Sequence, residues 1–318
     1  MTTVHGDSTD LTPSEAEESE ASAAGARTDS AESTVVEPEH TQAAESPPDP
    51  DAVDAAAAAG TADPPLEGGP VPGDGDAADL SDVGVDAGDD PSDLSVVVLV
   101  PAYNEADTVA DVVRAAKPYA DDVVVVDDAS DDDTGSVARE VADGVVTHPT
   151  NLGVGAALHT GYRLALRKEY DVVVQLDGDG QHDPSHIPEM VARLTETGAG
   201  MVVGSRWLNS SHKEYPPLRR AGIRFFTLEA NLLGGVDVTD ITSGYRVYDA
   251  SLLAELGRPA NGHWALEQTL EVARNGHDIE EVSVRMPPDS EGSQFDLETY
   301  AKYPARMVLT TLKVLLFR

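Results

Sequence analysis

The sequence predicts an α/β fold, with a mostly parallel central sheet flanked by helices and preceded by a disordered acidic tail. Short runs of β-branched residues alternate with amphipathic stretches of about a dozen residues, a pattern typical of βαβ units. Acidic residues directly follow several of these runs. The composition also changes abruptly near Leu94, which marks the start of the folded part.

Residues 1–93 are expected to form the tail. They contain 24 acidic residues, one basic residue (Arg27) and few aromatic or large aliphatic residues. Such a segment buries too little apolar surface to offset the backbone entropy lost on folding. We therefore assign residues 94–296 to one folded domain and residues 297–318 to a C-terminal amphipathic helix.

The net charge of the chain limits the kinds of partner that it can bind. The net charge is −37 at pH 7, and residues 94–318 are themselves acidic, with 34 acidic and 20 basic residues. Because binding a nucleic-acid backbone needs a basic face, we expect no nucleic-acid partner. Lysine is scarce, with five Lys against sixteen Arg. An acidic, lysine-poor surface suits concentrated salt, which screens its self-repulsion. We therefore hypothesise a salt-adapted archaeon as the source; a mesophilic protein with an acidic tail is the alternative.

Three features that the sequence lacks bear on where in the cell the protein is located. The chain has no Cys, so a disulfide or a zinc–thiolate site is excluded. Its N-terminus lacks the basic and apolar regions of an export signal. It also lacks a run of 18 apolar residues that would span a bilayer. These features predict a cytoplasmic location.

The first half of the domain shows the alternation most clearly. The expected strands are Ser95–Val100, Asp122–Val126, Val145–Thr147, Asp171–Leu176 and Gly200–Gly204, and the expected helices are Asn104–Ala116, Thr134–Ala142, Gly155–Arg167 and Pro184–Thr197. In such sheets the carboxyl ends of the strands form the ligand site. Residues 103–105, 127–128 and 177–179 should therefore lie at one edge of the sheet.

The pattern is looser after Trp207. We expect a helix that carries Arg219, Arg220 and Arg224 and extends to Leu233. Further helices are expected around Ala250–Leu256 and Leu266–Asn275, followed by a half-buried strand, Ile279–Met286. The final helix, 297–318, carries both apolar and basic residues. It could dock on the domain or lie in a membrane interface, and of these two nearly equal readings we lean to the membrane interface.

The segment after the fourth expected strand carries the strongest chemical signal. Asp177 and Asp179 flank Gly178, and Gln181 follows in the same turn. Two carboxylates at this spacing can face one divalent cation, and Mg²⁺ or Mn²⁺ prefers such oxygen ligands. A cation here would neutralise charge on a departing diphosphate. Turn formation alone is the other reading, since Asp-Gly pairs are common in turns.

A glycine-rich segment, Asn151–Gly155, precedes an expected helix. Its backbone N–H groups could approach a ligand or could simply cap the helix. The sequence leaves both readings open.

Six ordered motifs resemble the family 2 glycosyltransferases with a GT-A fold, and among them the dolichyl-phosphate mannose/glucose synthase-like enzymes. The motifs are Val98–Glu105 (VLVPAYNE), Val126–Ser130 (VDDAS), Asn151–Ala157 (NLGVGAA), Asp177–Pro184 (DGDGQHDP), Val203–Arg206 (VGSR) and Ser243–Arg246 (SGYR). The resemblance covers about residues 95–290 and implies inverting transfer of a hexose from a UDP- or GDP-linked donor.

The resemblance also implies roles for individual residues. The expected nucleotide-sugar-binding residues are Pro101, Tyr103, Glu105, Asp127, Asp128, Asp177 and Gly178. Asp177, Asp179 and Gln181 match the metal positions, with Mg²⁺ or Mn²⁺ as cofactor. Arg206 and Arg220 match basic positions that face the acceptor phosphate, a task for which the planar guanidinium is suited. A basic helix face paired with local carboxylates is the alternative for Arg220.

Asp179, Asp240 and Arg246 are the candidate catalytic residues. An Asp near position 240 often acts as general base in this family, which a hydroxyl acceptor requires. A phosphate acceptor is already anionic, so Asp240 could instead orient Arg246. One departure concerns Gly292–Gln294, where the family often has a basic residue; the donor-phosphate contact from this loop is therefore in doubt.

Three functions remain open from the sequence. We favour metal-dependent hexose transfer to a polyprenyl (dolichyl) phosphate, by a protein peripheral to the cytoplasmic face of the membrane. Transfer to a sugar hydroxyl of a growing glycan is the second hypothesis. A nucleotide-sugar-binding module without turnover is the third.

Overall fold

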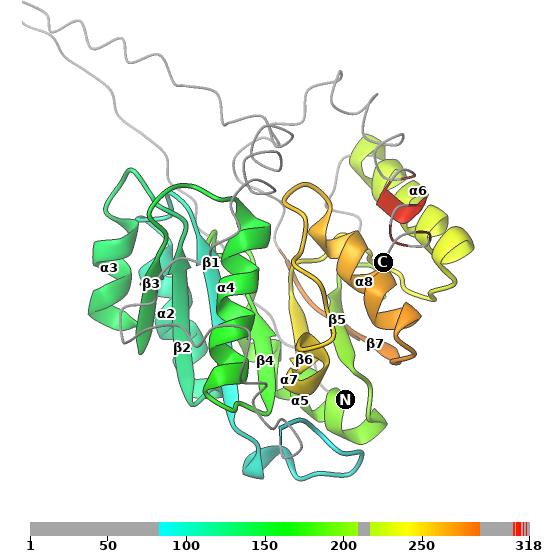
Figure 1. The fold of residues 1–318 in the computed structure, drawn as a ribbon, viewed down its shortest axis with the longest axis horizontal. Coiled ribbons are helices and arrows are strands. Elements are labelled where there is room, and N and C mark those ends of the chain that lie inside the picture. The colour runs from blue at the N-terminus through cyan, green and yellow to red at the C-terminus, as the bar shows by residue number, and fades with distance from the viewer. Residues whose placement is uncertain are drawn as a thin grey trace, which may run out of the picture. The chain divides into compact units, whose positions relative to one another are not determined.

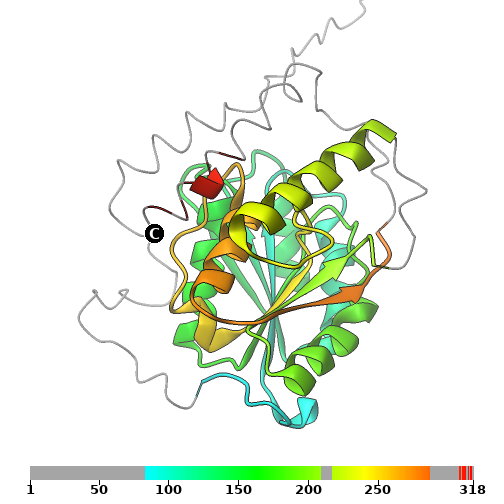
Figure 2. The ribbon, with the colours of Figure 1, turned by 90° about the vertical axis from the view of Figure 1, so that its right-hand side faces the viewer.

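A computed structural model describes residues 83–208 and 217–286, together with residues 308, 310–312, 314 and 316. Its centre is a seven-stranded sheet in the order β3-β2-β1-β4-β6-β5-β7 (Figure 1). Helices cover both faces of this sheet (Figure 2). The predicted α/β fold with a mostly parallel sheet is confirmed. Disorder was predicted for residues 1–82, but these residues fall outside the part of the chain that the structure describes.

Four parallel strands form one half of the sheet. They are β1 (Val96–Ala102), β2 (Asp122–Asp127), β3 (Gly144–Thr147) and β4 (Val172–Gln175). β1 lies in the middle of this half, and its residues 96–100 are all buried. Its continuous apolar run is what a strand covered on both faces requires.

The other half contains one reversed strand. β6 (Arg246–Asp249) pairs antiparallel with both β4 and β5 (Met201–Ser205), while β7 (Ile279–Ser283) pairs parallel with β5. No strand was predicted at β6, because its four residues, RVYD, form neither an apolar run nor an alternating pattern. The reversal places the loop before β6 at the same edge as the carboxyl ends of β4 and β5.

Alternate residues of the strands enter two apolar cores. Val98 and Val100 belong to the core under α2 and α5, whereas Val97 and Leu99 belong to the core under α4. The principal helices are α2 (Val109–Ala116), α3 (Thr134–Val141), α4 (Val154–Arg167), α5 (Ile187–Thr197), α6 (Pro217–Gly234), α7 (Ala250–Leu253) and α8 (Trp264–Arg274). Short 3₁₀ turns form η1 (Pro91–Asp93), η2 (Lys117–Tyr119) and η3 (Pro184–His186). The period-2 alternation thus fixes which helix each strand residue meets.

A third apolar cluster joins α6, α8 and the C-terminal segment. Val314 is fully buried there beside Phe226, Ala230 and Leu270, and Arg274 donates a hydrogen bond to the carbonyl of Val314. Leu312 and Leu316 are exposed. The described part of the C-terminal helix therefore docks on the domain, with some apolar side chains facing outward. Among the described residues, no helix is both long and apolar enough to cross a membrane.

Two predicted boundaries were wrong. Residues 83–93, assigned to the tail, belong to the domain, since Val85 packs on the core and Gly88 donates to the carbonyl of Thr195 at 2.8 Å. The helix expected from Asn104 begins only at Val109. Asn104 adopts a positive φ of 58°, which is incompatible with a right-handed helix.

The start of α4 provides a test of this packing. A Cβ atom on Gly155 would lie 2.2 Å from the carbonyl oxygen of Pro259, whereas a Cβ on Gly262 would meet no atom within 4 Å. Alanine ordinarily favours a helix over glycine by about 1 kcal/mol. Gly155→Ala should nevertheless destabilise the domain by about 1–3 kcal/mol, because the clash involves rigid backbone. Urea unfolding of Gly155→Ala beside Gly262→Ala, expected within about 0.5 kcal/mol of the parent, measures the difference.

Candidate active site at the carboxyl edge of the sheet

The ends of β1 and β4 meet closely at the carboxyl edge. A Cβ atom on Gly178 would lie 3.2 Å from the carbonyl oxygen of Pro101 and 3.5 Å from Cγ of Glu105. The hydroxyl of Thr108 donates to the Gly178 carbonyl at 2.7 Å and lies 3.1 Å from Oε2 of Glu105. The predicted convergence of residues 103–105 and 177–179 is therefore present. Gly178 thus favours this close approach of the two backbones, since a side chain there would have to push them apart slightly.

The loop after β1 is fixed by the loop after β2. The backbone N–H of Asn104 donates to Oγ of Ser130 at 3.0 Å, and that of Glu105 donates to Oγ1 of Thr134 at 2.7 Å. The hydroxyl of Tyr103 lies 3.3 Å from Asp131, and Tyr103 remains exposed. These contacts hold Tyr103 and Glu105 at the rim of the site. Neither the Ser130 nor the Thr134 role had been assigned from the sequence.

Asp127 and Asp128 end β2, and both are buried, with 4% and 3% exposure. Asp127 accepts a hydrogen bond from the backbone N–H of Ser130 at 3.0 Å. Asp128 accepts from the backbone of Leu152 and Gly153, at 2.9 and 2.7 Å, and pairs with His148 at 2.6 Å. These carboxylates therefore organise the loops around the site.

The glycine-rich segment is held by protein groups. The N–H of Gly153 donates to Asp128, and that of Gly155 donates to Oδ1 of Asn261 at 2.9 Å. The Asn261 side chain in turn donates to the carbonyl of Leu152 at 3.0 Å. Of the two readings left open by the sequence, this geometry favours loop packing at the start of α4. The role of Asn261 was not visible in the sequence, because it lies 106 residues away from Gly155.

Asp177 lies against Gly244 and His182, two residues for which no role was predicted from the sequence. A Cβ atom on Gly244 would lie 2.5 Å from Oδ2 of Asp177, so only glycine fits beside this carboxylate. The backbone N–H of Asp177 donates to Nδ1 of His182 at 3.1 Å, and Nε2 of His182 lies 3.5 Å from Oδ2 of Asp177. His182 also stacks on Tyr245, with ring centroids 5.1 Å apart.

These contacts determine the charge and the tautomer of the His182 ring. Burial lowers the pKa of His182, so the ring is neutral at neutral pH. Since Nδ1 accepts a hydrogen bond, the proton is on Nε2, the atom that faces the Asp177 carboxylate. His182 and Gly244 thus fix Asp177 from two sides. Both residues stand within motifs of the sequence, but a hydrogen-bond role requires the fold to be known.

The carboxylates at this edge influence one another. Burial raises the pKa of Asp177 to about 6, against the opposing effect of the Arg206 and Arg246 charges. Burial also raises the pKa of Glu105, and the charges of Asp179, Asp132 and Asp177 act in the same direction. Like charges held this close favour a bound cation.

The side-chain oxygen atoms of this turn suit a divalent ion that takes only some of its ligands from the protein. Asp177 is part-exposed and Asp179 exposed, with Gln181 in the same turn, and the Gln181 N–H donates to Asp179 at 2.9 Å. Within the described residues, no three His, Asp or Glu side chains converge into a complete metal centre. Mg²⁺ commonly uses one or two carboxylates and takes its other ligands from water and substrate phosphates.

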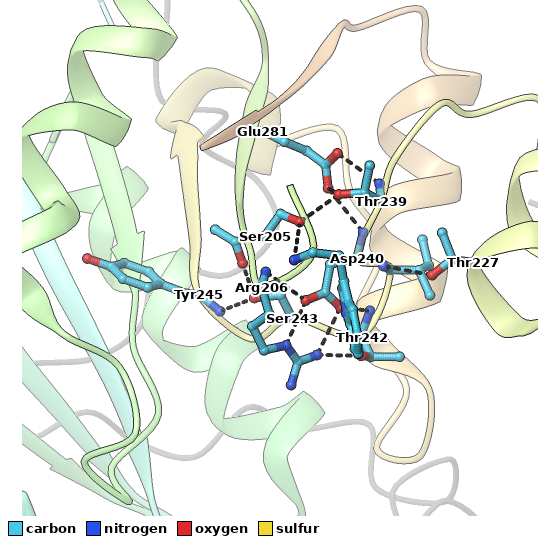
Figure 3. Close-up of polar contacts among 12 residues, drawn as sticks. Ser205, Arg206, Thr227, Thr239, Asp240, Thr242, Ser243, Tyr245 and Glu281 are labelled. Carbon is cyan, nitrogen blue, oxygen red and sulfur yellow. Dashed lines mark hydrogen bonds and ion pairs between the residues drawn. The ribbon is translucent and has the colours of Figure 1, made fainter. Parts of the chain in front are cut away.

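Arg206 and Asp240 form a buried pair beside this site (Figure 3). Nε and Nη2 of Arg206 donate to the two oxygens of Asp240 at 2.6 and 2.8 Å, and Nη2 also donates to Thr242 at 2.6 Å. Asp240 has no exposed surface. Although burial alone would raise the pKa of Asp240, the charge and hydrogen bonds of Arg206 hold it below its usual value. Asp240 therefore orients Arg206, not Arg246 as the sequence suggested.

Arg246 occupies a different environment from the one expected of a catalytic residue. Its side chain is fully buried, and it donates to the carbonyls of Ser243 and Ala265 at 3.0 and 2.8 Å and to Thr269 at 3.1 Å. Its guanidinium carbon also lies 5.2 Å from the ring centroid of Trp264. These contacts join the loop before β6 to α8, so the geometry gives Arg246 a structural place.

Arg220 lies on α6 and is partly exposed. The structure brings Asp177, Asp179, Glu105 and Arg206 to one edge of the sheet. Gly292–Gln294 lies outside the described residues.

Comparison with known proteins agrees with this fold. The fold is similar to that of glucosyl-3-phosphoglycerate synthase from Mycobacterium tuberculosis, solved with Mn²⁺, UDP and phosphoglyceric acid; the TM-score is 0.53 at 22% identity, over 70% of this chain and 79% of that one. An undecaprenyl-phosphate mannosyltransferase of Micrococcus luteus is 33% identical over 60% of this chain and 83% of its own length. A dolichyl-phosphate hexose transferase of Haloferax volcanii is 30% identical over 60% of this chain and 82% of its own length.

The family model described as glycosyl transferase family 2 matches residues 97–257. This span runs from β1 through β6 and includes the paired aspartates after β4 and the Arg206–Asp240 pair. The chain therefore belongs to glycosyl transferase family 2, with a GT-A fold, and it is a glycosyltransferase.

Proposed function

We propose that the protein transfers a hexose from a nucleotide-diphosphate sugar to a polyprenyl phosphate, with the assistance of a divalent cation. The observation that carries this proposal is the buried pair of Arg206 and Asp240. Asp240 is the residue that would serve as base for a hydroxyl acceptor, yet both its oxygens are bound to Arg206. A phosphate needs no base and does need a cation, and Arg206 supplies one.

The donor would lie along the ends of β1, β2 and β4. Tyr103 and Glu105 at the rim, with Pro101, Asp127 and Asp128 beneath them, are proposed to bind or position the base and ribose. The diphosphate would then reach Asp177, Asp179 and Gln181, which would hold Mg²⁺ or Mn²⁺. The bound ion would neutralise the charge that develops on the departing nucleoside diphosphate. Nucleotide and metal in the mycobacterial structure support this assignment.

The acceptor phosphate would bind on the other side of the site. Asp240 and Thr242 hold the Nε and Nη2 groups of Arg206, so the pair presents the guanidinium in a fixed orientation. Asp240 is thus a positioning residue for Arg206. One phosphate oxygen would form a bond to the anomeric carbon as the bond from that carbon to the donor diphosphate breaks, which inverts the configuration. Arg220 is proposed as a second phosphate contact.

The relatives' lipid acceptors suggest work at a membrane surface. α6 exposes Phe225, Leu228 and Leu232 at helical spacing, and Arg224 is exposed on the same helix. An amphipathic surface of this kind can lie in a lipid interface, with its basic groups at the headgroups. We propose a peripheral contact at the cytoplasmic face through α6 and the exposed C-terminal leucines. The salt-adapted source remains a prediction.

A two-acceptor assay tests the proposed function. Purified protein is incubated with labelled UDP- and GDP-hexoses, Mn²⁺ or Mg²⁺, and either a polyprenyl phosphate or an oligosaccharide. Label in the organic phase is expected. Label only on the oligosaccharide would support hydroxyl transfer, and nucleotide-sugar binding without product would support a binding module; either result would reject the proposal.

Asp179→Asn should lower the transfer rate by about a hundredfold or more, since it removes a charged metal ligand worth several kcal/mol. The amide retains the oxygen that accepts from Gln181, so the turn and the melting temperature should be unchanged. Steady-state rates across a Mn²⁺ titration measure the effect. A variant with parental kinetics at every Mn²⁺ concentration would exclude Asp179 from the metal site.

Gly244→Ala should displace the Asp177 carboxylate, because the added methyl group would lie 2.5 Å from its oxygen. We expect Mn²⁺ affinity in the presence of UDP to fall by about tenfold or more, as for other changes that misplace a ligand. Calorimetric titration of Mn²⁺ into the UDP-bound protein gives the affinity. Gly262→Ala, whose methyl group meets no neighbour, is the matched control; an equal loss in both variants would contradict the prediction.

His182→Phe should keep the stack on Tyr245 but remove both contacts to Asp177. Residues that hydrogen-bond to metal ligands typically contribute 10–100-fold in metal affinity, so Mn²⁺ binding should weaken by roughly that factor. Tyr245→Phe retains the stack and removes only the hydroxyl, which bonds to the Asp183 carbonyl at 3.2 Å. It should bind Mn²⁺ as the parent does. Electron paramagnetic resonance of free Mn²⁺ distinguishes the two variants.

A further inference from the structure

A small cavity lies at the start of α8, next to the Arg206–Asp240 pair. Its volume is about 120 Å³, and it is lined by Ile241, Thr242, Gly262, His263, Trp264, Ala265 and Leu266. Thr242 belongs to both features, since it lines the cavity and its hydroxyl accepts the 2.6 Å hydrogen bond from Nη2 of Arg206. The cavity therefore adjoins a residue that contacts the guanidinium that we assign to the acceptor phosphate.

The lining favours an apolar occupant. Ile241, Trp264, Ala265 and Leu266 are apolar residues of the lining, which also contains His263. The Thr242 hydroxyl is already engaged, because it also donates to Oδ1 of Asp240 at 3.1 Å. A hexose would place several hydroxyl groups here, and each one left without a partner would cost about 1–3 kcal/mol. A hydrocarbon group needs no partner. An apolar cavity of about 150 Å³ is large enough for benzene, so about 120 Å³ suits a group of about five carbons.

The position of the cavity agrees with an acceptor that continues toward a lipid surface. Ile241 and Leu266 pack in the same apolar cluster as Phe226 and Ala230 of α6. α6 is also the helix whose outer surface exposes apolar side chains. A molecule with a phosphate at Arg206 and hydrocarbon in the cavity would thus adjoin the surface proposed for membrane contact.

We propose that this cavity binds the first isoprene unit of a polyprenyl phosphate whose phosphate is held by Arg206. The inference rests on the proposed function and adds a specificity site to it. The cavity would distinguish an isoprenyl phosphate from a bare phosphate or a phosphorylated sugar, because only the first buries hydrocarbon next to the charged group.

Gly262 lines the cavity, and a larger side chain can be placed there without meeting its neighbours. A Cβ atom there meets no atom within 4 Å, so the series Gly262→Ala, Gly262→Val and Gly262→Leu adds volume stepwise. The KM for the polyprenyl phosphate should rise along the series, by about tenfold or more for leucine, as for other lost hydrophobic contacts in a pocket. The KM for the nucleotide sugar should stay constant. Melting temperatures of the series show whether each variant is folded.

Direct binding gives a readout that does not depend on turnover. The chain has two tryptophans, so Trp207→Phe leaves Trp264, in the cavity wall, as the single reporter. Geranyl phosphate should change the Trp264 emission in a saturable manner, and inorganic phosphate at the same concentration should not. Adding Gly262→Leu to this background should weaken the response to geranyl phosphate by about tenfold.

The two readouts separate failure of this inference from failure of the proposed function. If the parent protein transfers no hexose to lipid but Trp264 still reports geranyl phosphate, the function is wrong and the isoprenyl site stands. If the parent is active, yet the acceptor KM is constant across the series and Trp264 does not respond, the isoprenyl site is wrong. A rise in the donor KM instead would place the hexose in the cavity and also overturn the inference.

Discussion

The buried pair between Arg206 and Asp240 is the interaction on which the site depends. It joins the end of β5 to the loop before β6, and Asp240 is anchored further through its backbone N–H, which donates to Glu281 at 3.1 Å. Removing one partner from such a pair typically costs about 3–5 kcal/mol, because the other charge is left buried and unpaired. The same loop carries Gly244, whose backbone supports Asp177. A single charged contact therefore holds the loop that contains both Asp240 and Gly244.

The site is also a balance of charges in a strongly acidic chain. Asp177 and Asp179 each repel the Glu105 carboxylate at one edge, and Arg206 lies near enough to lower the pKa of Asp177 against the effect of burial. Repulsion of this kind destabilises the domain without ligand and favours binding of a cation. The stability lost in bringing the carboxylates together is thus part of the binding chemistry.

Much of this could be predicted from the sequence, since the relevant information is local. The apolar runs of β1, β2 and β4 located the strands, and the rule that ligands bind at their carboxyl ends located Asp177 and Asp179. The start of α2 could not be predicted, because the positive φ of Asn104 depends on a loop 26 residues away.

The partners of the arginines were equally hidden. Proximity in sequence suggested that Asp240 would pair with Arg246, but β6 runs antiparallel and turns Arg246 toward α8. Asp240 then faces Arg206, 34 residues earlier in the chain. The cavity beside Thr242 had no signature in the sequence, since it forms only where the loop before β6 meets the first turn of α8.

The reversed strand β6 also separates, along the chain, the groups proposed for the nucleotide from the groups proposed for the acceptor. The groups proposed for the nucleotide come from β1, β2 and β4, whereas Arg206, Asp240 and Thr242 come from the single stretch of chain between β5 and β6. That stretch leaves and returns to the sheet on adjacent strands. Substitutions within it could therefore change the acceptor preference, but its Gly244 lies against Asp177 and so ties the stretch to the nucleotide half.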